Sequence, residues 1–242
     1  WCWKAGGAAV SNTDGSITSE VSANPTAGFS IVSFTGNASN STVGHGLGKT
    51  LKFIIHKNRD NDGDWYVYHS SLGATKNLRL NQPLSELTTS NLYNDTEPTS
   101  STFALGTSGG SNANNDKYIA YCWSEIEGFS KFGKYEGDAD TAQNGPFVYC
   151  GFKPAWIMLK NTSDAGAWVM MDSARCSANP NNNHLLANAS NSESISNMKV
   201  DFLSNGFRIT NLTTNYADIN GNHDRIIFAA FAESPFKTAN AK

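Results

Sequence analysis

The sequence has little charge, and its opposite charges nearly cancel. Only 16% of its 242 residues are Asp, Glu, Lys or Arg, where about 25% is usual. With 21 acidic and 18 basic groups the formal net charge is −3. A protein that holds nucleic acid through a basic face is normally strongly positive, so we expect no nucleic-acid partner. No run of 18 apolar residues occurs, so we expect no membrane insertion.

Cysteine is scarce, and sustained helical periodicity is absent. Cys2, Cys122, Cys150 and Cys176 form no C-x-x-C pair, which makes structural zinc a weak hypothesis. Free, buried cysteines are favoured over disulfides. Aromatic residues, in contrast, are plentiful: 6 Trp, 13 Phe and 8 Tyr are too many for a disordered tract. The chain opens on Trp-Cys-Trp without an initiator Met, which favours a fragment or a processed product.

Short segments rich in aromatic and β-branched residues recur between clusters of Asn, Gly, Ser and Asp. Their lengths and spacing favour antiparallel strands in a sandwich or barrel, and hence an all-β protein. The expected strands are 29–35, 51–57, 65–70, 118–124, 156–160, 168–172, 207–210 and 226–232.

An internal repeat organises these segments. Residues 51–73 align without a gap on residues 154–176, so that Trp65 falls on Trp168. Further matches pair 28–37 with 128–138, 101–105 with 205–209, and 116–121 with 224–229. The alignment predicts two tandem, tightly packed antiparallel β-sandwich units with a jelly-roll-like topology, each about 105 residues long. A β-barrel or a propeller-like arrangement of repeats is the alternative.

The repeat also sets the expected domain limits. Residues 1–3 are similar to residues 121–123, the last strand of a unit. We therefore expect residues 1–27 to hold the last strand of a preceding repeat and a linker. Residues 28–127 would form the first unit, and residues 128–242 the second.

Positions kept in both copies are interpreted as scaffold, and function is expected where the copies differ. The predicted core residues are Trp65, Trp168, Trp123 and Phe231. Polar loops that differ between the copies are the predicted ligand-binding loops, with a plain solvated connection as the alternative. Their candidate residues are Asn94, Asp95, Ser111, Asn112, Asn114, Asn181, Asn182 and His184.

Two acidic motifs point weakly to chemistry. Asp60, Asp62 and Asp64 alternate as in a calcium loop, but the distal Glu of an EF-hand is missing and a hairpin loop is the better account. Glu125 and Glu127 would share one face of a strand about 6.6 Å apart, where a retaining glycosidase needs about 5–5.5 Å. We therefore predict no catalytic residue, cofactor or metal.

Several strings resemble a tandem-repeat domain at the C-terminal ends of tail-fibre-like and other virion proteins of marine bacteriophages. The resemblance covers nearly the whole chain. Its strings are 3–7, 12–17, 29–37, 44–48, 65–73, 127–128, 145–149, 201–207, 230–233 and 235–237.

The resemblance implies a non-catalytic virion structural protein: a tail fibre or a receptor-binding domain for host attachment, assembled in the host cytoplasm. Expected partners are other virion subunits and a host surface polysaccharide or protein receptor. The full-length protein is expected to be a homo-oligomer, a trimer. The alternative is a polysaccharide-degrading enzyme on a β-sandwich scaffold, for which Glu125 and Glu127 are the local carboxylate pair.

Overall fold

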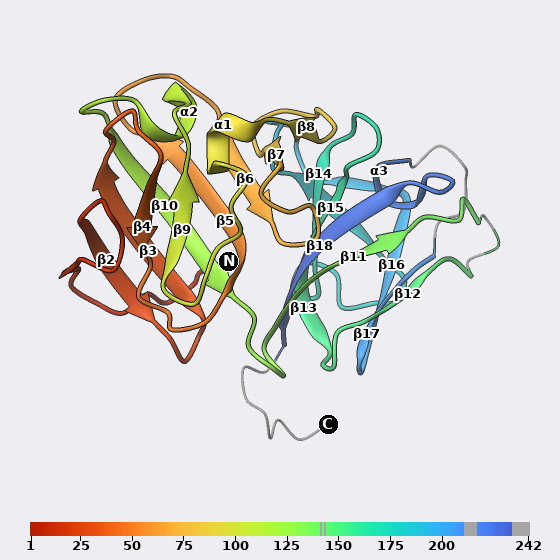
Figure 1. Ribbon diagram of the computed structural model, residues 1–242. Coiled ribbons are helices and arrows are strands. Elements are labelled where there is room, and N and C mark those ends of the chain that lie inside the picture. The colour runs from red at the N-terminus through yellow and green to blue at the C-terminus, as the bar shows by residue number, and fades with distance from the viewer. Residues whose placement is uncertain (141, 143, 211–216, 234–242) are drawn as a thin grey trace. The chain divides into compact units, whose positions relative to one another are not determined.

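The computed structural model (Figure 1) describes residues 1–140, 142, 144–210 and 217–233. Its regular structure in this part of the chain is strands joined by three single-turn helices, which confirms the all-β expectation. The chain divides into two compact units. Unit 1 is Trp1–Leu80 with Leu87–Ile126, and unit 2 is Asn81–Glu86 with the chain from Glu127 onward.

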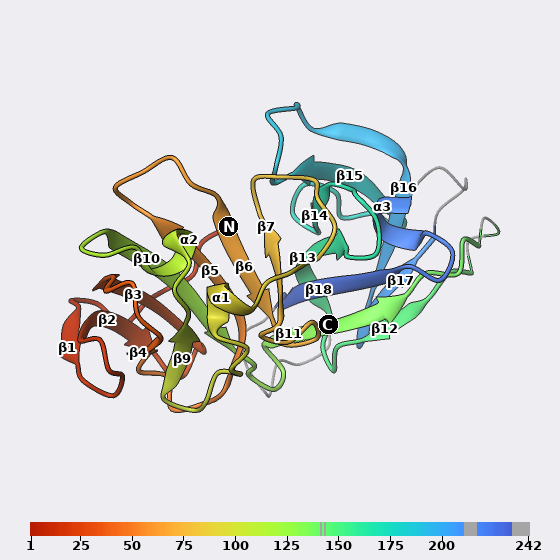
Figure 2. The same cartoon turned by 45° about the horizontal axis from the view of Figure 1, so that its top comes forward.

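Unit 1 pairs an eight-stranded sheet, in the order β1-β2-β3-β10-β5-β6-β7-β8, with the two-stranded sheet β4-β9. Figure 2 shows the short β1 beside β2 at the end of the larger sheet. The elements are β1 (Val10–Asn12), β2 (Ser19–Asn24), β3 (Phe29–Thr35), β4 (Ser41–Gly44), β5 (Leu51–Asn58), β6 (Trp65–His69), β7 (Lys76–Arg79), β8 (Leu87–Thr88), α1 (Ser90–Tyr93), β9 (Thr102–Leu105), α2 (Gly109–Asn112) and β10 (Lys117–Ser124).

The core of unit 1 lies between these two sheets. On the central strand β10, Tyr118, Ala120 and Cys122 alternate with more exposed neighbours and face inward. Val43 and Phe103 reach the same cluster from β4 and β9. Side chains from two facing sheets thus fill one apolar layer, as in a β-sandwich.

Unit 2 joins its strands into one nearly closed antiparallel sheet, β11-β18-β13-β14-β15-β16-β17-β12. Its central strand β18 pairs with β11 and β13, as β10 pairs with β3 and β5. The elements are β11 (Ser130–Glu136), β12 (Phe147–Tyr149), β13 (Pro154–Asn161), β14 (Trp168–Asp172), β15 (Asn181–Leu186), β16 (Ser194–Leu203), β17 (Gly206–Ile209), α3 (Ala217–Asn220) and β18 (Arg225–Ala232).

The strands confirm the tandem repeat. β5 and β13 begin and end at aligned residues, as do β6 and β14. The cross-strand pair Lys57–Trp65 of unit 1 recurs as Lys160–Trp168 in unit 2. The units differ after β7 and β15, because unit 1 has α1 where unit 2 has the long strand β16. That strand connects the two faces of unit 2 into one sheet.

The N-terminal segment is not the detached strand and linker that we expected. Trp1–Trp3 form no strand, and the Trp3 ring instead lies edge-to-face with Trp123 at a centroid distance of 5.8 Å. Residues 10–12 and 19–24 are strands of the unit 1 sheet. In β2, buried Ser19 and Val21 alternate with exposed Glu20, as in a half-buried strand. The sequence does not show this strand clearly, because most of its residues are small or polar.

A second departure from the expected limits is the segment Asn81–Glu86, which belongs to unit 2. Within that unit the Gly166 amide donates to the Pro83 carbonyl at 2.7 Å, and the Glu86 amide donates to the Thr162 carbonyl at 3.0 Å. These backbone bonds fix the segment beside the loop that joins β13 to β14.

Of the predicted core residues, Trp168, Trp123 and Phe231 are buried, but Trp65 is only partly buried and the prediction for it is wrong. Side chains alternate along β6 and β14, so Trp65 and Trp168 point away from the main hydrophobic core of each unit. The residues that follow them, Tyr66 and Val169, pack in that core. Trp123 and Phe231 lie at equivalent positions of the two repeats. Each lies at the centre of its own group of aromatic rings.

All four cysteines are free, as expected, but only Cys122 and Cys150 are buried, because Cys2 is exposed and Cys176 half-buried. Among the described residues, no helix is long and apolar enough to cross a bilayer.

Candidate functional site

The predicted loop residues near α1 and α2 divide into exposed and buried positions. Asn94, Asp95 and Asn114 are exposed. Ser111 and Asn112 are buried, so their assignment to a ligand-binding loop is wrong. The Ser111 hydroxyl donates to the Leu92 carbonyl at 2.9 Å, and the Asn112 amide group donates to the Ser39 and Gly106 carbonyls at 2.6 and 3.0 Å. These two side chains hold surrounding turns together.

The remaining loop candidates lie on strand β15, not on a connection. Asn181 is buried, and its amide group donates to the Asp172 carbonyl at 2.7 Å and to the Cys176 carbonyl at 3.0 Å. Asn182 is half-buried, and His184 is buried, with its pKa lowered by that burial. Asn181, expected in a ligand-binding or solvated loop, thus satisfies two backbone carbonyls, one at the end of β14 and one in the turn after it.

Neither acidic motif forms a chemical site. The Asp60 carboxylate accepts from the Lys117 amide at 2.7 Å, and Asp64 pairs with Arg79 at 3.1 Å. No group of three or more His, Cys, Asp or Glu in the described part of the chain could hold a metal ion. Strand β10 ends at Ser124, so Glu125 and Glu127 do not share a strand face and their expected alternation is wrong.

Lys160 is the most buried amine among the described residues, and the repeat explains it. Burial lowers the pKa of Lys160 to about 8. Its Nζ donates to the Asn161 and Gly166 carbonyls, both at 2.8 Å. The equivalent Lys57 donates to the Asn61 carbonyl at 2.6 Å. Both lysines therefore close the same hairpin loop, which is a structural role.

Two large aromatic side chains are exposed on β12 of unit 2. Phe147 is 43% exposed and Tyr149 is 64% exposed, while Val148 between them is buried in the core. Because side chains alternate along a strand, both rings leave the same outer face of the sheet. Their separation along the strand is about 6.7 Å at the Cα atoms, from a rise of about 3.3–3.4 Å per residue.

A charged pair lies beside the first ring. Phe147 is the direct cross-strand partner of Arg208 on β17, and Arg208 is the partner of Asp201 on β16. The three therefore form one row across three neighbouring strands, which lie side by side in Figures 1 and 2. Arg208 is exposed and Asp201 is half-buried. Desolvation raises the pKa of the Asp201 carboxyl, and Arg208 opposes that shift.

The second ring lies beside a buried glycine. Tyr149 is the cross-strand partner of Gly206, which in turn faces Leu203 on β16. A Cβ at position 206 would collide with the Val148 carbonyl oxygen, so glycine is required there for the strands to approach. We call Phe147, Tyr149, Asp201, Gly206 and Arg208 the aromatic platform.

Unit 1 has no such platform. The matching registers place Thr42 and Gly44 of β4 where unit 2 has Phe147 and Tyr149, and Ala104 of β9 where unit 2 has Arg208. The chain itself also covers this edge of unit 1. The Ile17 amide donates to the Thr42 carbonyl at 3.0 Å, and Ile17 bridges Val43.

The platform was missed at the sequence level, although two signals were present. Residues 145–149 belong to the strings that carry the family resemblance, and function was expected where the copies differ. The sequences of residues 41–44 and 147–149 do not reveal that the two segments are equivalent. Small residues in the first copy stand where the second has aromatic residues.

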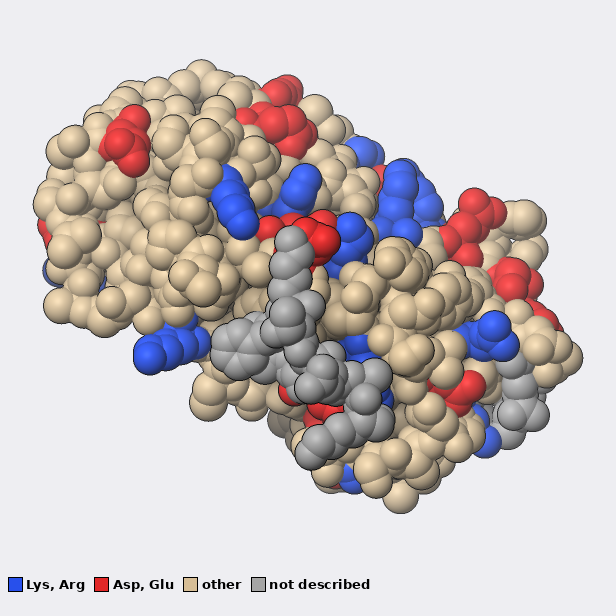
Figure 3. All heavy atoms as spheres, turned by 90° about the horizontal axis from the view of Figure 1, so that it is seen from below, with Lys and Arg blue, Asp and Glu red and all other residues tan. Residues whose placement is uncertain are grey.

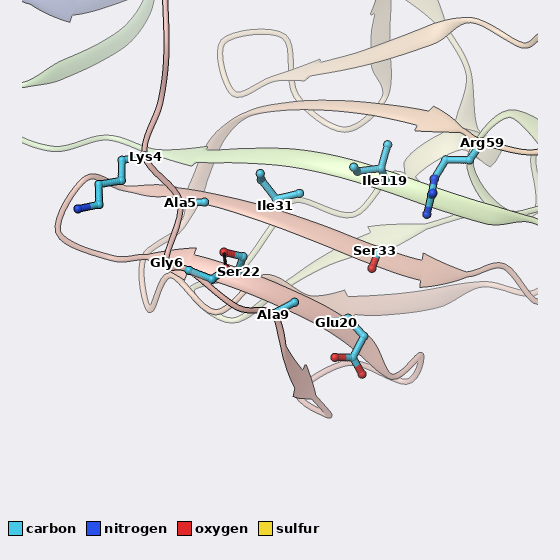
Figure 4. Close-up of a pocket in the computed structure, with 11 residues that line it drawn as sticks. Lys4, Ala5, Gly6, Ala9, Glu20, Ser22, Ile31, Ser33, Arg59 and Ile119 are labelled. Carbon is cyan, nitrogen blue, oxygen red and sulfur yellow. Dashed lines mark hydrogen bonds between the residues drawn. The ribbon is translucent and has the colours of Figure 1, made fainter.

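A groove of about 710 Å³ lies on the outer face of unit 1 (Figure 4). Its floor is Ile31 and Ile119, and one wall is the N-terminal segment, held by a 2.7 Å hydrogen bond from Ser22 to the Gly7 carbonyl. Among the described residues that line it there is no aromatic ring, and the charged ones are Lys4, Glu20 and Arg59. Because its charges are mixed and it offers no aromatic ring for stacking, the groove indicates the chemical class of a ligand less clearly than the platform does.

Comparison with known proteins adds a family and no function. No curated protein and no solved structure matches the chain significantly. The platform and the tandem organisation are therefore read from this chain alone. Residues 1–235, nearly the whole sequence, match the domain of unknown function DUF7483, and the chain belongs to that family.

Proposed function

We propose that this chain is a non-catalytic host-attachment domain of a bacteriophage particle that binds a surface polysaccharide through the aromatic platform. The assignment to a virion, where other virion subunits are its partners, is supported by the sequence resemblance. The observation that carries the binding function is the pair of exposed rings, Phe147 and Tyr149, beside Arg208 and Asp201.

Sugar rings present C–H groups on one face and hydroxyl groups around the edge. An exposed aromatic ring offers a flat apolar surface on which the C–H face of a sugar can stack. Tyr also carries a hydroxyl group at the edge of its ring. Arg208 donates hydrogen bonds and the Asp201 carboxylate accepts them, so the pair can bind hydroxyl groups in both senses. A few placed polar groups beside apolar surface are typical of small-molecule recognition.

The rest of the surface is consistent with an uncharged, hydroxyl-rich ligand. Figure 3 shows one face of the molecule, on which acidic and basic side chains are interspersed in a largely uncharged surface. Low charge and abundant Asn, Ser and Thr give many neutral hydrogen-bonding groups and little attraction for a polyanion such as nucleic acid.

The test is affinity electrophoresis of the purified chain through gels that contain bacterial capsular polysaccharides or lipopolysaccharide O-chains, including those of marine strains. We expect at least one polysaccharide to retard the wild type and the F147A/Y149A variant to migrate freely. Trp1→Ala is the matched control, because Trp1 is 52% exposed and lies outside the platform.

Three results would contradict the proposal. The first is migration without retardation in every gel, and the second is equal retardation of the F147A/Y149A variant. The third is release of new reducing ends from the retarding polysaccharide, which would favour the enzyme alternative.

A further inference from the structure

We infer that the aromatic platform binds the interior of a long polysaccharide chain side-on, and not a chain end or a single sugar. The inference rests on the proposed function and specifies the form of its ligand.

The exposure of the rings excludes enclosure of the ligand. Sites that capture a small molecule or a chain end usually bury about 70–90% of its surface in a concave pocket. Tyr149 is 64% exposed, its ring lies close to Gly151, and its cross-strand partner Gly206 is buried and has no side chain. We therefore infer that a ligand contacts the described part of this face on one side, and that a chain continues past the rings in both directions.

The spacing of the rings sets a minimum length for the ligand. Phe147 and Tyr149 are two residues apart on one strand, or about 6.7 Å at the Cα atoms. One sugar can stack on one ring, whereas both rings are used only by two or more linked sugars. Once one sugar is stacked on the first ring, the glycosidic linkage holds the next sugar near the second ring at a high effective concentration. The affinity therefore rises steeply as the first few sugars are added to the oligosaccharide.

The position of β12 leaves room for a long chain. β12 is the last strand of its sheet in the described part of unit 2. In unit 1 the equivalent edge is covered by residues 16 and 17, through the bond from the Ile17 amide to the Thr42 carbonyl. Only residues 125–128 separate the end of β10 from Phe129, too few to supply a similar cover from that side. We therefore expect one open platform per chain.

The experiment uses a length series of oligosaccharides prepared from the polysaccharide that retards the wild type, measured by isothermal titration calorimetry. We expect no measurable binding of the monosaccharide, a steep rise in affinity over the first few sugars, and then a plateau. Several protein molecules should bind one long chain. Borohydride reduction of the chain ends should leave the affinity unchanged.

The single variants Phe147→Ala and Tyr149→Ala should each weaken binding of a plateau-length oligosaccharide about tenfold, as loss of one of two stacked rings implies. A monosaccharide that binds as tightly as the polymer, or binding lost on reduction of the ends, would overturn the side-on inference while leaving polysaccharide binding intact. Absence of polymer binding is a different failure, because it refutes the proposed function itself.

Discussion

Asn161 donates a 2.7 Å hydrogen bond from Nδ2 to Oδ2 of Asp224, which fastens the end of β13 to the residue before β18. Unit 1 repeats the bond between Asn58 and Asp116, also at 2.7 Å. This Asn–Asp pair, which both copies of the repeat keep, therefore joins two neighbouring strands by a side-chain hydrogen bond. That role agrees with the interpretation of the shared residues as scaffold.

We expect the two copies of this bond to differ in their contribution to stability. Asp224→Ala leaves part of the buried Asn161 amide group without its partner and should cost about 1–3 kcal/mol of unfolding free energy. Asp116→Ala should cost less, because Asp116 is only half-buried and water can replace it. Urea denaturation followed by circular dichroism measures both; equal losses would contradict the ranking.

Trp168 and Trp65 occupy aligned positions but should respond differently to truncation. Trp168 is 1% exposed, so Trp168→Ala should cost about 3–5 kcal/mol. Trp65 is only partly buried, and Trp65→Ala should cost about half as much, because less apolar surface returns to water. Equilibrium unfolding of both variants tests the difference, and a Trp65→Ala variant as unstable as Trp168→Ala would refute it.

His56 should make the protein sensitive to acid. Burial lowers the pKa of His56 from 6.5 to about 3. The unfolded chain therefore binds a proton below about pH 6.5 that the folded chain excludes, so stability falls as the pH drops from 6.5 towards 3. Leu159 occupies the equivalent position in unit 2, so His56→Leu is the natural substitution. Denaturation curves at pH 7, 5 and 4 should show a weaker pH dependence in the variant; an unchanged slope would argue against this origin.

Under the proposed function, the full-length protein should be a homo-oligomer. Phage fibre components are symmetric assemblies, and a weakly charged surface lets copies pack closely. We expect a trimer by light scattering at micromolar concentration. A monomer under those conditions would remove the expectation.

The sequence predicts the central strands well because their side chains are apolar whatever surrounds them. β10, β13 and β18 consist mostly of aromatic and aliphatic residues, and β5 contains Phe53-Ile54-Ile55. Strand β15 was not expected, since Asn181–Leu186 begins with three Asn and a His. Its first residue is satisfied where it is buried, because the Asn181 side chain donates to the carbonyls of Asp172, at the end of β14, and of Cys176, in the turn that follows. The composition of the segment does not show how the chain turns to bring these partners close.

The site was harder to predict for a similar reason. Phe147-Val148-Tyr149 has the composition of any buried strand, and its alternation shows only that two rings share a face. Whether that face is covered depends on the residues that precede each unit. Unit 1 has Val10–Asn24 in that place, and unit 2 has almost nothing. Exposure here is a property of the tertiary arrangement.

The short connection before unit 2 also affects how these chains behave when crowded. In unit 1, β2 pairs with β3, whereas β11, the counterpart of β3, is the end strand of its described sheet. Bare strand edges act as templates on which chains stack into fibrous aggregates. Lys134 lies exposed on β11, and an incoming strand would have to remove water from its ammonium group. We expect this charge to oppose the pairing of further chains with β11, as charged residues do on other strand edges.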